Sequence, residues 1–171
     1  MAMTMESSQA SSEEVNLNSS AIFSDGFLRG GNMKREEYAV SLRNRGYNCA
    51  QAVVCAFADQ TDLSEEQLFA VSECFGSGLG CTKGNCGALN GACMLAGLSM
   101  CTRHLNRPDS KAHTYMMERS IVNDFEQQAG AITCRDIKGL DTGEVLCECE
   151  ECVRIGVRLV EKYVYTGEEN G

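Results

Sequence analysis

The stretch that decides the fold is Cys74-Phe-Gly-Ser-Gly-Leu-Gly-Cys-Thr-Lys-Gly-Asn-Cys-Gly-Ala-Leu-Asn-Gly-Ala-Cys93, which holds six glycines and four cysteines. Glycine at this density allows positive φ angles and close approach by other groups. After Cys86, small residues recur at helical spacing. They predict a helix with a face that another helix or a cofactor approaches closely, and a tight helix–helix crossing is the simpler of these two interpretations.

The segments on either side of this loop have helical periodicity. Asn48 is a good N-cap, and Ser64-Glu-Glu-Gln67 is a capping box. Helices are expected at about residues 38–43, 49–58, 65–76, 86–101, 110–128 and 148–165, with a single turn at 133–136. The helices expected at 49–58 and 86–101 are apolar nearly all round and should form the core. We therefore expect an all-α, single-domain bundle of about five to six helices with a central Gly/Cys-rich loop.

Length and composition limit the remaining possibilities. The chain has 171 residues and a net charge of −9, which argues against nucleic acid and anionic membrane surfaces as partners. No apolar run reaches ~18 residues, so we expect no membrane span. The N-terminus lacks the basic segment followed by an apolar segment that is typical of a signal peptide, so we expect a cytoplasmic protein. Residues 1–32 are polar and predict a disordered tail or leader, which leaves 33–167 as the domain.

The cysteine count points to thiol chemistry. Eleven cysteines cannot all pair, and a reducing cytosol disfavours structural disulfides, so the important ones should be thiolates, metal ligands or redox couples. Cys49, Cys86, Cys134 and Cys152 all fall near expected helix N-termini, where the helix dipole favours thiolates and anionic groups. If these helix starts converge, they make a site for a cluster or a thiolate-bound metal.

Other cysteines and both histidines are assigned structural positions. Cys55, Cys74 and Cys101 lie in apolar helical context and are expected in the core, and His104 and His113 on the surface. Because the chain has no Cys-x-x-Cys-His sequence, we expect no covalent haem.

Four motifs together resemble a known family. They are Tyr47-Asn-Cys-Ala-Gln-Ala-Val53, Phe75-Gly-Ser-Gly-Leu-Gly80, Cys86-Gly-Ala-Leu-Asn-Gly-Ala92 and Thr133-Cys-Arg135, followed by the late Cys152. This pattern resembles the C_GCAxxG_C_C proteins, a family named for its four cysteines and associated with redox activity. The resemblance covers about residues 34–165. A related domain occurs in split-Soret cytochromes, where the resemblance implies an iron–sulfur cluster beside haem.

The resemblance implies that Cys49, Cys86, Cys134 and Cys152 are the four family cysteines. The family motif reads Gly-Cys-Ala-x-x-Gly, whereas this chain has Asn85 before Cys86 and Gly87 after it, so Cys81 and Cys93 remain alternatives to Cys86. The fourth family cysteine has alternatives as well, because Cys147, Cys149 and Cys152 all lie within six residues.

Three functions fit this pattern. The leading one is a small redox protein that transfers electrons through a [2Fe-2S] iron–sulfur cluster bound by Cys49, Cys86, Cys134 and Cys152, with an unidentified redox partner protein. The second is a thiol–disulfide oxidoreductase that uses Cys149 and Cys152, or Cys49 with Cys86. Against it, the acidic neighbours of the Cys149-Glu-Glu-Cys152 pair should raise the pKa of both thiols.

The third function is a structural zinc site in a helical module that binds another protein. Zinc sites usually contain paired Cys-x₂₋₄-Cys knuckles, and the candidate ligands include only one such pair, which keeps the iron–sulfur interpretation ahead. Apolar helices and a cluster near the surface are also compatible with a homodimer.

Overall fold

The computed structural model describes residues 33–166, so the tail or leader expected at 1–32 lies outside the described residues. The described chain is built from helices that agree with the expected ones to within a few residues. The α-helices are α2 (Arg35–Asn44), α3 (Cys49–Cys55), α4 (Glu65–Ser72), α5 (Gly87–Met100), α6 (Lys111–Ala129), α7 (Cys134–Ile137) and α8 (Cys149–Tyr163). The short turns are η1 (Ala58–Gln60), η2 (Glu73–Phe75) and η3 (Gly78–Thr82).

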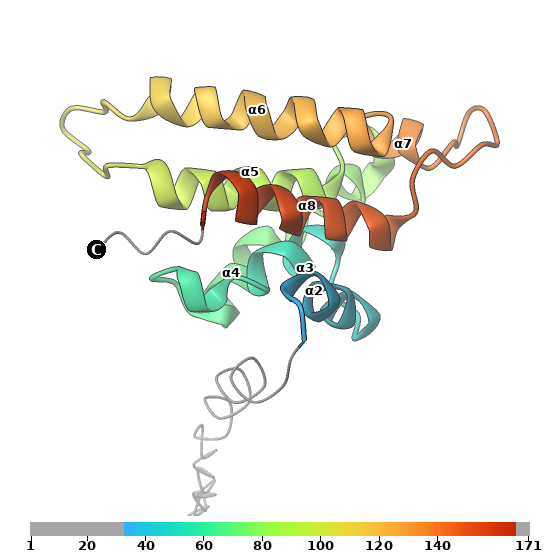
Figure 1. Ribbon diagram of the computed structural model, residues 1–171, viewed down its shortest axis with the longest axis horizontal. Coiled ribbons are helices and arrows are strands. Elements are labelled where there is room, and N and C mark those ends of the chain that lie inside the picture. The colour runs from blue at the N-terminus through green and yellow to red at the C-terminus, as the bar shows by residue number, and fades with distance from the viewer. Residues whose placement is uncertain (1–32, 167–171) are drawn as a thin grey trace, which may run out of the picture. The chain divides into compact units, whose positions relative to one another are not determined.

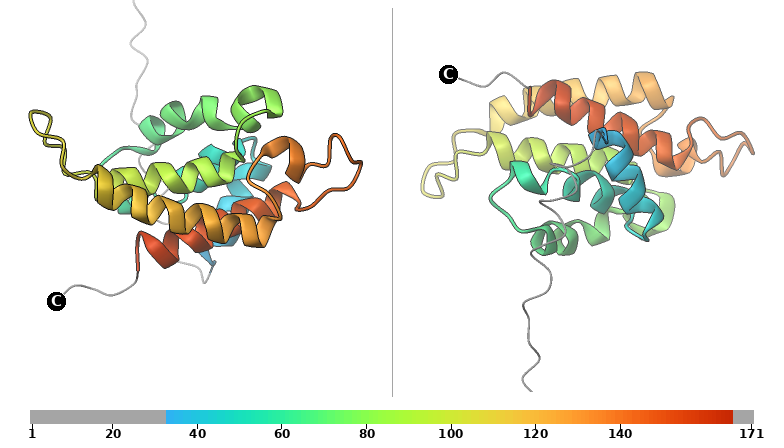
Figure 2. Two further views of the ribbon diagram at one scale, coloured as in Figure 1. Left: turned by 90° about the horizontal axis from the view of Figure 1, so that it is seen from above. Right: turned by 60° about the horizontal axis from the view of Figure 1, so that its bottom comes forward.

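The helices form three layers (Figure 1). Helix α6 lies on one side, α5 and α8 lie side by side in the middle, and α2, α3 and α4 lie on the other side; Figure 2 shows the same helices from two further directions. The all-α prediction is confirmed: the described part of the chain contains seven α-helices, of which α7 is the expected single turn. Its one β-bridge joins Asn85 to Thr133. None of the helices between residues 33 and 166 has the length and apolarity to cross a bilayer.

The expected tight crossing of the small-residue helices is confirmed. A Cβ atom added at Gly91 of α5 would lie 3.0 Å from the carbonyl oxygen of Ala50 and 3.0 Å from Cβ of Val53, both in α3. A Cβ at Gly156 of α8 would lie 3.0 Å from the carbonyl oxygen of Ala88 in α5. Glycine therefore lets the backbones of α3, α5 and α8 approach one another more closely than larger residues allow.

Both expected N-caps are present. The Asn48 side chain accepts hydrogen bonds from the backbone N–H groups of Ala50 and Gln51, and the Gln51 side chain accepts one from the Asn48 N–H. This reciprocal pair is a capping box that the sequence analysis did not identify. The box at Ser64 and Gln67 is as expected. Caps of this kind stabilise a helix by about 1 kcal/mol, so they fix where α3 and α4 begin.

The glycine-rich loop has an unusual backbone. Gly78 and Gly80 have positive φ angles of 59° and 71°, and so do the non-glycine residues Ser77, Leu79 and Thr82. Left-handed conformations cost a non-glycine residue about 1–2 kcal/mol. The loop is held by hydrogen bonds with the segment before α7, from Cys134 N–H to the Gly84 carbonyl (3.0 Å) and from Cys86 N–H to the Ile132 carbonyl (2.7 Å). The loop therefore packs against the start of α7.

Two of the three cysteines expected in the core are outside it. Cys55 is buried as predicted, but Cys74 and Cys101 are exposed. Cys74 lies in the short turn η2 beyond the end of α4, and Cys101 follows the last residue of α5 in an extended conformation. Both helices end earlier than expected, at Ser72 and Met100, so these two side chains do not lie on a buried helix face. His104 and His113 lie on the surface, as expected.

Candidate functional site

Five cysteines line one small cavity. Its volume is about 50 Å³, more than a single water requires. The lining residues are Arg43, Cys49, Ser77, Cys86, Gly87, Cys134, Ile137, Lys138, Cys149 and Cys152. The structure thus brings together all four cysteines named as candidate ligands, which are more than 100 residues apart at their extremes, and adds Cys149. Cys147, Cys93 and Cys81 are not among the residues that line the cavity.

Each of these cysteines lies at the start of a helix. Cys49, Cys134 and Cys149 are the first residues of α3, α7 and α8, and Cys86 is the N-cap of α5. Cys152 follows one turn into α8. Unpaired backbone N–H groups and the positive end of the helix dipole favour negative charge at these positions. The cavity is therefore surrounded by four helix N-termini, an environment that suits thiolates.

Glycines allow these helix starts to meet. A Cβ atom on Gly87 would lie 3.2 Å from Cβ of Cys49 and 3.0 Å from the carbonyl oxygen of Phe75. A Cβ on Gly78, where φ is already +59°, would lie 2.7 Å from Cβ of Cys134. Any side chain at Gly78 or Gly87 would push the starts of α3, α5 and α7 apart, so these glycines determine the spacing of the cysteines.

Two pairs of thiols are joined by hydrogen bonds across helices. The Cys49 thiol donates to the sulfur of Cys149, which is the main reason that the pKa of Cys149 is lowered to about 5. Lys138 and Arg43 lower this pKa further through their positive charge. The same hydrogen bond, together with burial, raises the pKa of Cys49. The two pKa values therefore move in opposite directions, as expected for two thiols joined by one hydrogen bond.

The second pair joins α5 to α8. The Cys152 thiol donates to the sulfur of Cys86 and so lowers the pKa of Cys86, with help from the backbone N–H groups of Ala88 and Leu89. This donation and burial raise the pKa of Cys152. Cys134 makes no such pair, and its pKa is raised mainly by burial.

The prediction that the acidic neighbours raise the pKa of both thiols is wrong for Cys149. The acidic neighbours in question are Glu148, Glu150 and Glu151. The pKa of Cys149 is instead lowered, because the hydrogen bond from Cys49 and the positive charges of Lys138 and Arg43 outweigh the effect of burial. The pKa of Cys152 is raised, but the main cause is its hydrogen bond to Cys86.

Arg43 is the unexpected member of the cavity wall. It comes from the last turn of α2, a helix that supplies no cysteine, and its guanidinium hydrogen-bonds the sulfurs of Cys49 and Cys149. Its Nε atom is buried, and among residues 33–166 it has no hydrogen-bond partner. A buried donor without a partner costs about 1–3 kcal/mol. Arg43 thus offers an unused N–H group beside the two sulfurs that it contacts.

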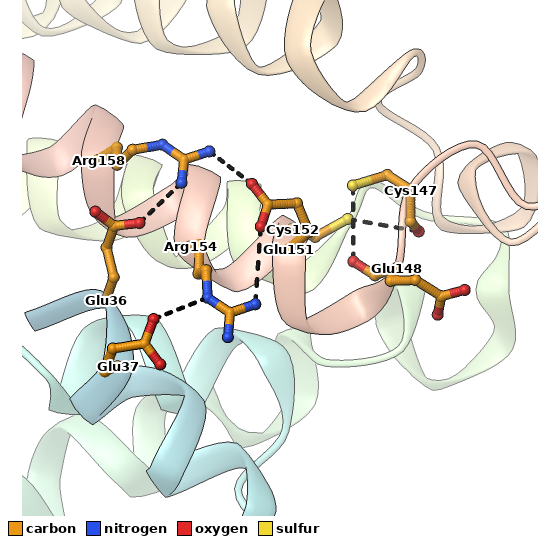
Figure 3. A network of polar contacts seen from close by, with 8 residues as sticks. All are labelled: Glu36, Glu37, Cys147, Glu148, Glu151, Cys152, Arg154 and Arg158. Carbon is orange, nitrogen blue, oxygen red and sulfur yellow. Dashed lines mark hydrogen bonds and ion pairs between the residues drawn. The ribbon is translucent and has the colours of Figure 1, made fainter.

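Ion pairs hold α2 against α8 next to the cavity (Figure 3). Arg158 of α8 contacts Glu36 of α2 and Glu151 of its own helix, both at 2.8 Å. Arg154 contacts Glu37 of α2 at 3.2 Å. Figure 3 also shows Cys147 close to Cys152 at the start of α8, outside this network. The network adds polar contacts between α2, the helix of Arg43, and α8, the helix that carries Cys149 and Cys152.

The cavity is not a preformed metal site. In the part of the chain that the structure describes, no three His, Cys, Asp or Glu side chains are arranged to hold a metal ion as they stand. The thiols are instead engaged in the two hydrogen-bonded pairs. Binding a metal requires loss of the thiol protons and changes of side-chain rotamer, which cysteine can make about its single χ1 bond.

The comparison with known families agrees with the motifs. Residues 47–163 match the family described as "Putative redox-active protein (C_GCAxxG_C_C)". The chain belongs to this family. The matched region begins before α3 and ends with α8, so it contains every cysteine of the cavity but not Arg43. No curated protein sequence and no solved structure matches the chain.

Sequence reasoning missed both cations of the cavity. Lys138 lies four residues after Cys134, a spacing that places two side chains on the same side of a helical turn, and this signal was available in the sequence. Arg43 carries no comparable signal, because it belongs to a different helix and its position depends on how α2 packs against α8.

Proposed function

We propose that this member of the C_GCAxxG_C_C family transfers electrons through a [2Fe-2S] cluster bound in the cysteine-lined cavity. Cys49, Cys86, Cys134 and Cys152 would be the ligands, because clusters of this type take four thiolates. The observation that carries the proposal is that these four cysteines, from four different helices, line one cavity. A cluster there would link α3, α5, α7 and α8.

The residues around the cavity suit a negatively charged cluster. Soft thiolates are the protein ligands that iron–sulfur clusters prefer, and four thiolates give such a group a net negative charge. Arg43 and Lys138 provide positive charge in the cavity wall, and the buried Nε–H of Arg43 has a hydrogen bond to donate. The backbone N–H groups of Ala88 and Leu89 already donate to the sulfur of Cys86.

A cluster supplies one-electron chemistry, and the chain would set its reduction potential. Hydrogen bonds to the ligand sulfurs and nearby positive charge stabilise the reduced, more negative state and raise the potential. Arg43, Lys138 and the start of α5 act in this direction. Burial of Cys86, Cys134 and Cys152, which are at most 6% exposed, disfavours added charge and acts in the other direction.

The low pKa of Cys149 supports thiol–disulfide exchange as the second candidate function. A thiolate near neutral pH is the reactive form in such exchange. However, Cys149 and Cys152 each donate to or accept from a sulfur on a different helix, so the Cys-x-x-Cys spacing does not itself define the reactive pair. Three cysteines of the cavity are also buried, which a cluster explains and an exchange enzyme does not require.

The first test is anaerobic purification, followed by a visible absorption spectrum and assays of iron, zinc and acid-labile sulfide on the same sample. The proposal expects broad visible bands with two iron and two sulfide per chain. A colourless protein with zinc would support the structural zinc site instead. A colourless protein with neither metal, reproduced after reconstitution with iron and sulfide, would contradict the proposal and leave thiol–disulfide exchange.

A further inference from the structure

The cavity has one cysteine more than a cluster needs. If Cys49, Cys86, Cys134 and Cys152 are ligands, Cys149 is left over, yet it lines the same small cavity as Cys49. The two residues are the first of α3 and α8, and they lie 100 positions apart in the chain. Cys149, which is not a ligand but lies beside one, therefore needs a function other than binding the cluster.

Exposure separates this pair from the other cysteines of the cavity. Cys49 and Cys149 are partly exposed, whereas Cys86, Cys134 and Cys152 are buried. A small oxidant can therefore reach Cys49 and Cys149 but not the buried pair Cys86 and Cys152. Both side chains line the same cavity of only about 50 Å³, so rotation about their χ1 bonds can bring the two sulfurs together with little movement of α3 or α8.

We propose that Cys49 and Cys149 form a reversible disulfide in the protein without a cluster, and that this disulfide closes the cavity to metal. The disulfide itself depends only on the geometry of the two cysteines. The closing of the cavity to metal rests on the proposed function, because it takes Cys49 to be a ligand. The pair would then act as a redox-controlled gate on cluster assembly.

The oxidant is a low-molecular-weight disulfide of the glutathione type. The Cys149 thiolate attacks one sulfur of that disulfide, forms a mixed disulfide and releases one thiolate. The Cys49 sulfur, losing its proton, then attacks the sulfur of Cys149 and releases the second small thiol. The two protein thiols lose two electrons in total, and one small disulfide becomes two small thiols. Arg43 and Lys138, beside the pair, favour the approach of an oxidant that carries carboxylates.

The first experiment maps the disulfide. Cluster-free, reduced full-length protein is exposed to oxidised glutathione under argon, blocked with N-ethylmaleimide, digested without reduction and sequenced by tandem mass spectrometry. We expect Cys49–Cys149 to be the first disulfide formed. The Cys152→Ser variant should still form it, whereas Cys149→Ser should leave Cys49 as a free thiol, because Cys149 is the residue that attacks the small disulfide first. A first disulfide between Cys149 and Cys152, or none at Cys49, would overturn the proposal.

The second experiment tests the gate with ferrous iron alone, because sulfide would itself reduce a disulfide. After treatment with oxidised glutathione, the wild type should bind less than one-tenth of the iron that it binds when reduced, and dithiothreitol should restore binding. Cys149→Ser should bind iron equally before and after oxidation. Equal iron binding by oxidised and reduced wild type would overturn the gate, and loss of iron binding by reduced Cys149→Ser would make Cys149 a ligand.

The outcomes keep the two proposals apart. If the disulfide forms but no variant binds iron or a cluster, the proposed function fails while the Cys49–Cys149 couple stands. If a cluster forms on the reduced protein and oxidation never joins Cys49 to Cys149, the proposed function stands while the gate fails.

Discussion

The helix crossing and the cysteine cavity share helices α3, α5 and α8, to which the cavity adds α7 and Arg43 of α2, yet the two regions are packed in opposite ways. At the crossing, Gly91 and Gly156 bring the backbones of α3, α5 and α8 so close that not even a methyl group fits without strain. At the N-terminal ends of these helices a cavity of about 50 Å³ remains, lined by thiols and two cations. The close crossing fixes the helices rigidly, so the cysteines at their ends face one another across a small, defined space.

Cysteines near the crossing and cysteines in the cavity also differ in the pKa of their thiols. Cys55 lies near the crossing, and burial raises its pKa to about 12. Cys149 is surrounded by Cys49, Lys138 and Arg43, and its pKa is lowered to about 5. A thiol near the crossing is thus an inert apolar group, whereas a thiol in the cavity has the surroundings of a ligand or a nucleophile.

The largest expected effect separates the cavity from the core by iron content. Replacing Cys86 by Ser should abolish cluster binding, because a serine oxygen is a hard ligand and a poor substitute for thiolate. The matched change Cys55→Ser removes a buried thiol that does not line the cavity and should leave iron and sulfide at the wild-type level. Iron and acid-labile sulfide assays on both variants check this prediction. Equal loss of iron and sulfide in both variants would contradict the division of the cysteines into cluster ligands and core residues.

The next effect concerns the stability of the crossing. Gly91→Val places a side chain where a single Cβ atom already lies 3.0 Å from Ala50 and Val53, and such overpacking costs about 1–3 kcal/mol in free energy of unfolding. The control is Gly97→Ala in the same helix, because nothing lies within 4 Å of the added Cβ. The free energy of unfolding of this control should rise by about 0.5–1 kcal/mol, because alanine lowers the backbone entropy of the unfolded chain. Urea unfolding measures both, and similar stabilities would show that α3 and α5 do not cross so closely.

A third prediction concerns pH and the protein without a cluster. A lowered pKa keeps Cys149 deprotonated above about pH 5, so its alkylation rate should level off below pH 7. The pKa of Cys93, outside the cavity, is raised by burial to about 12, and its alkylation rate should still be rising at pH 9. Iodoacetamide rates followed for each cysteine by mass spectrometry test this contrast. A midpoint near 8.5 for Cys149 would mean that Cys49 and the two cations do not stabilise its thiolate.

The smallest effect concerns the ion pairs between α2 and α8. Because both partners are partly exposed, Arg158→Ala should lower the free energy of unfolding by about 1 kcal/mol or less and leave the iron content unchanged. Arg103→Ala, which breaks a more exposed pair with Asp62, neither residue of which lines the cavity, serves as the control and should cost no more. Loss of iron in Arg158→Ala alone would show that the placement of Arg43 depends on this network.

The fold could be predicted from the sequence because its signals are local. Caps such as Asn48 and Ser64 fix helix starts within one turn, and the recurrence of small residues after Cys86 marks the crossing face. Helix ends were less certain, because α4 and α5 end without a strong stop signal. The errors at Cys74 and Cys101 both follow from this, since one or two residues decide whether a side chain at a helix end is buried.

The site could be predicted only in part. Four of its cysteines were found because each stands beside a cap or in a first turn, which are again local features. The hydrogen-bonded pairing of Cys49 with Cys149 and of Cys86 with Cys152, and the presence of Arg43, depend on which helix faces which. Such contacts between distant segments leave no trace in the spacing of a single sequence.

The most direct test of the central claim is a crystal structure of the anaerobically purified protein with diffraction data collected on both sides of the iron absorption edge. The account predicts an iron anomalous peak between the starts of α3, α5, α7 and α8, in contact with the sulfurs of Cys49, Cys86, Cys134 and Cys152. An iron peak elsewhere, or a peak in the cavity at the zinc edge alone, would contradict it.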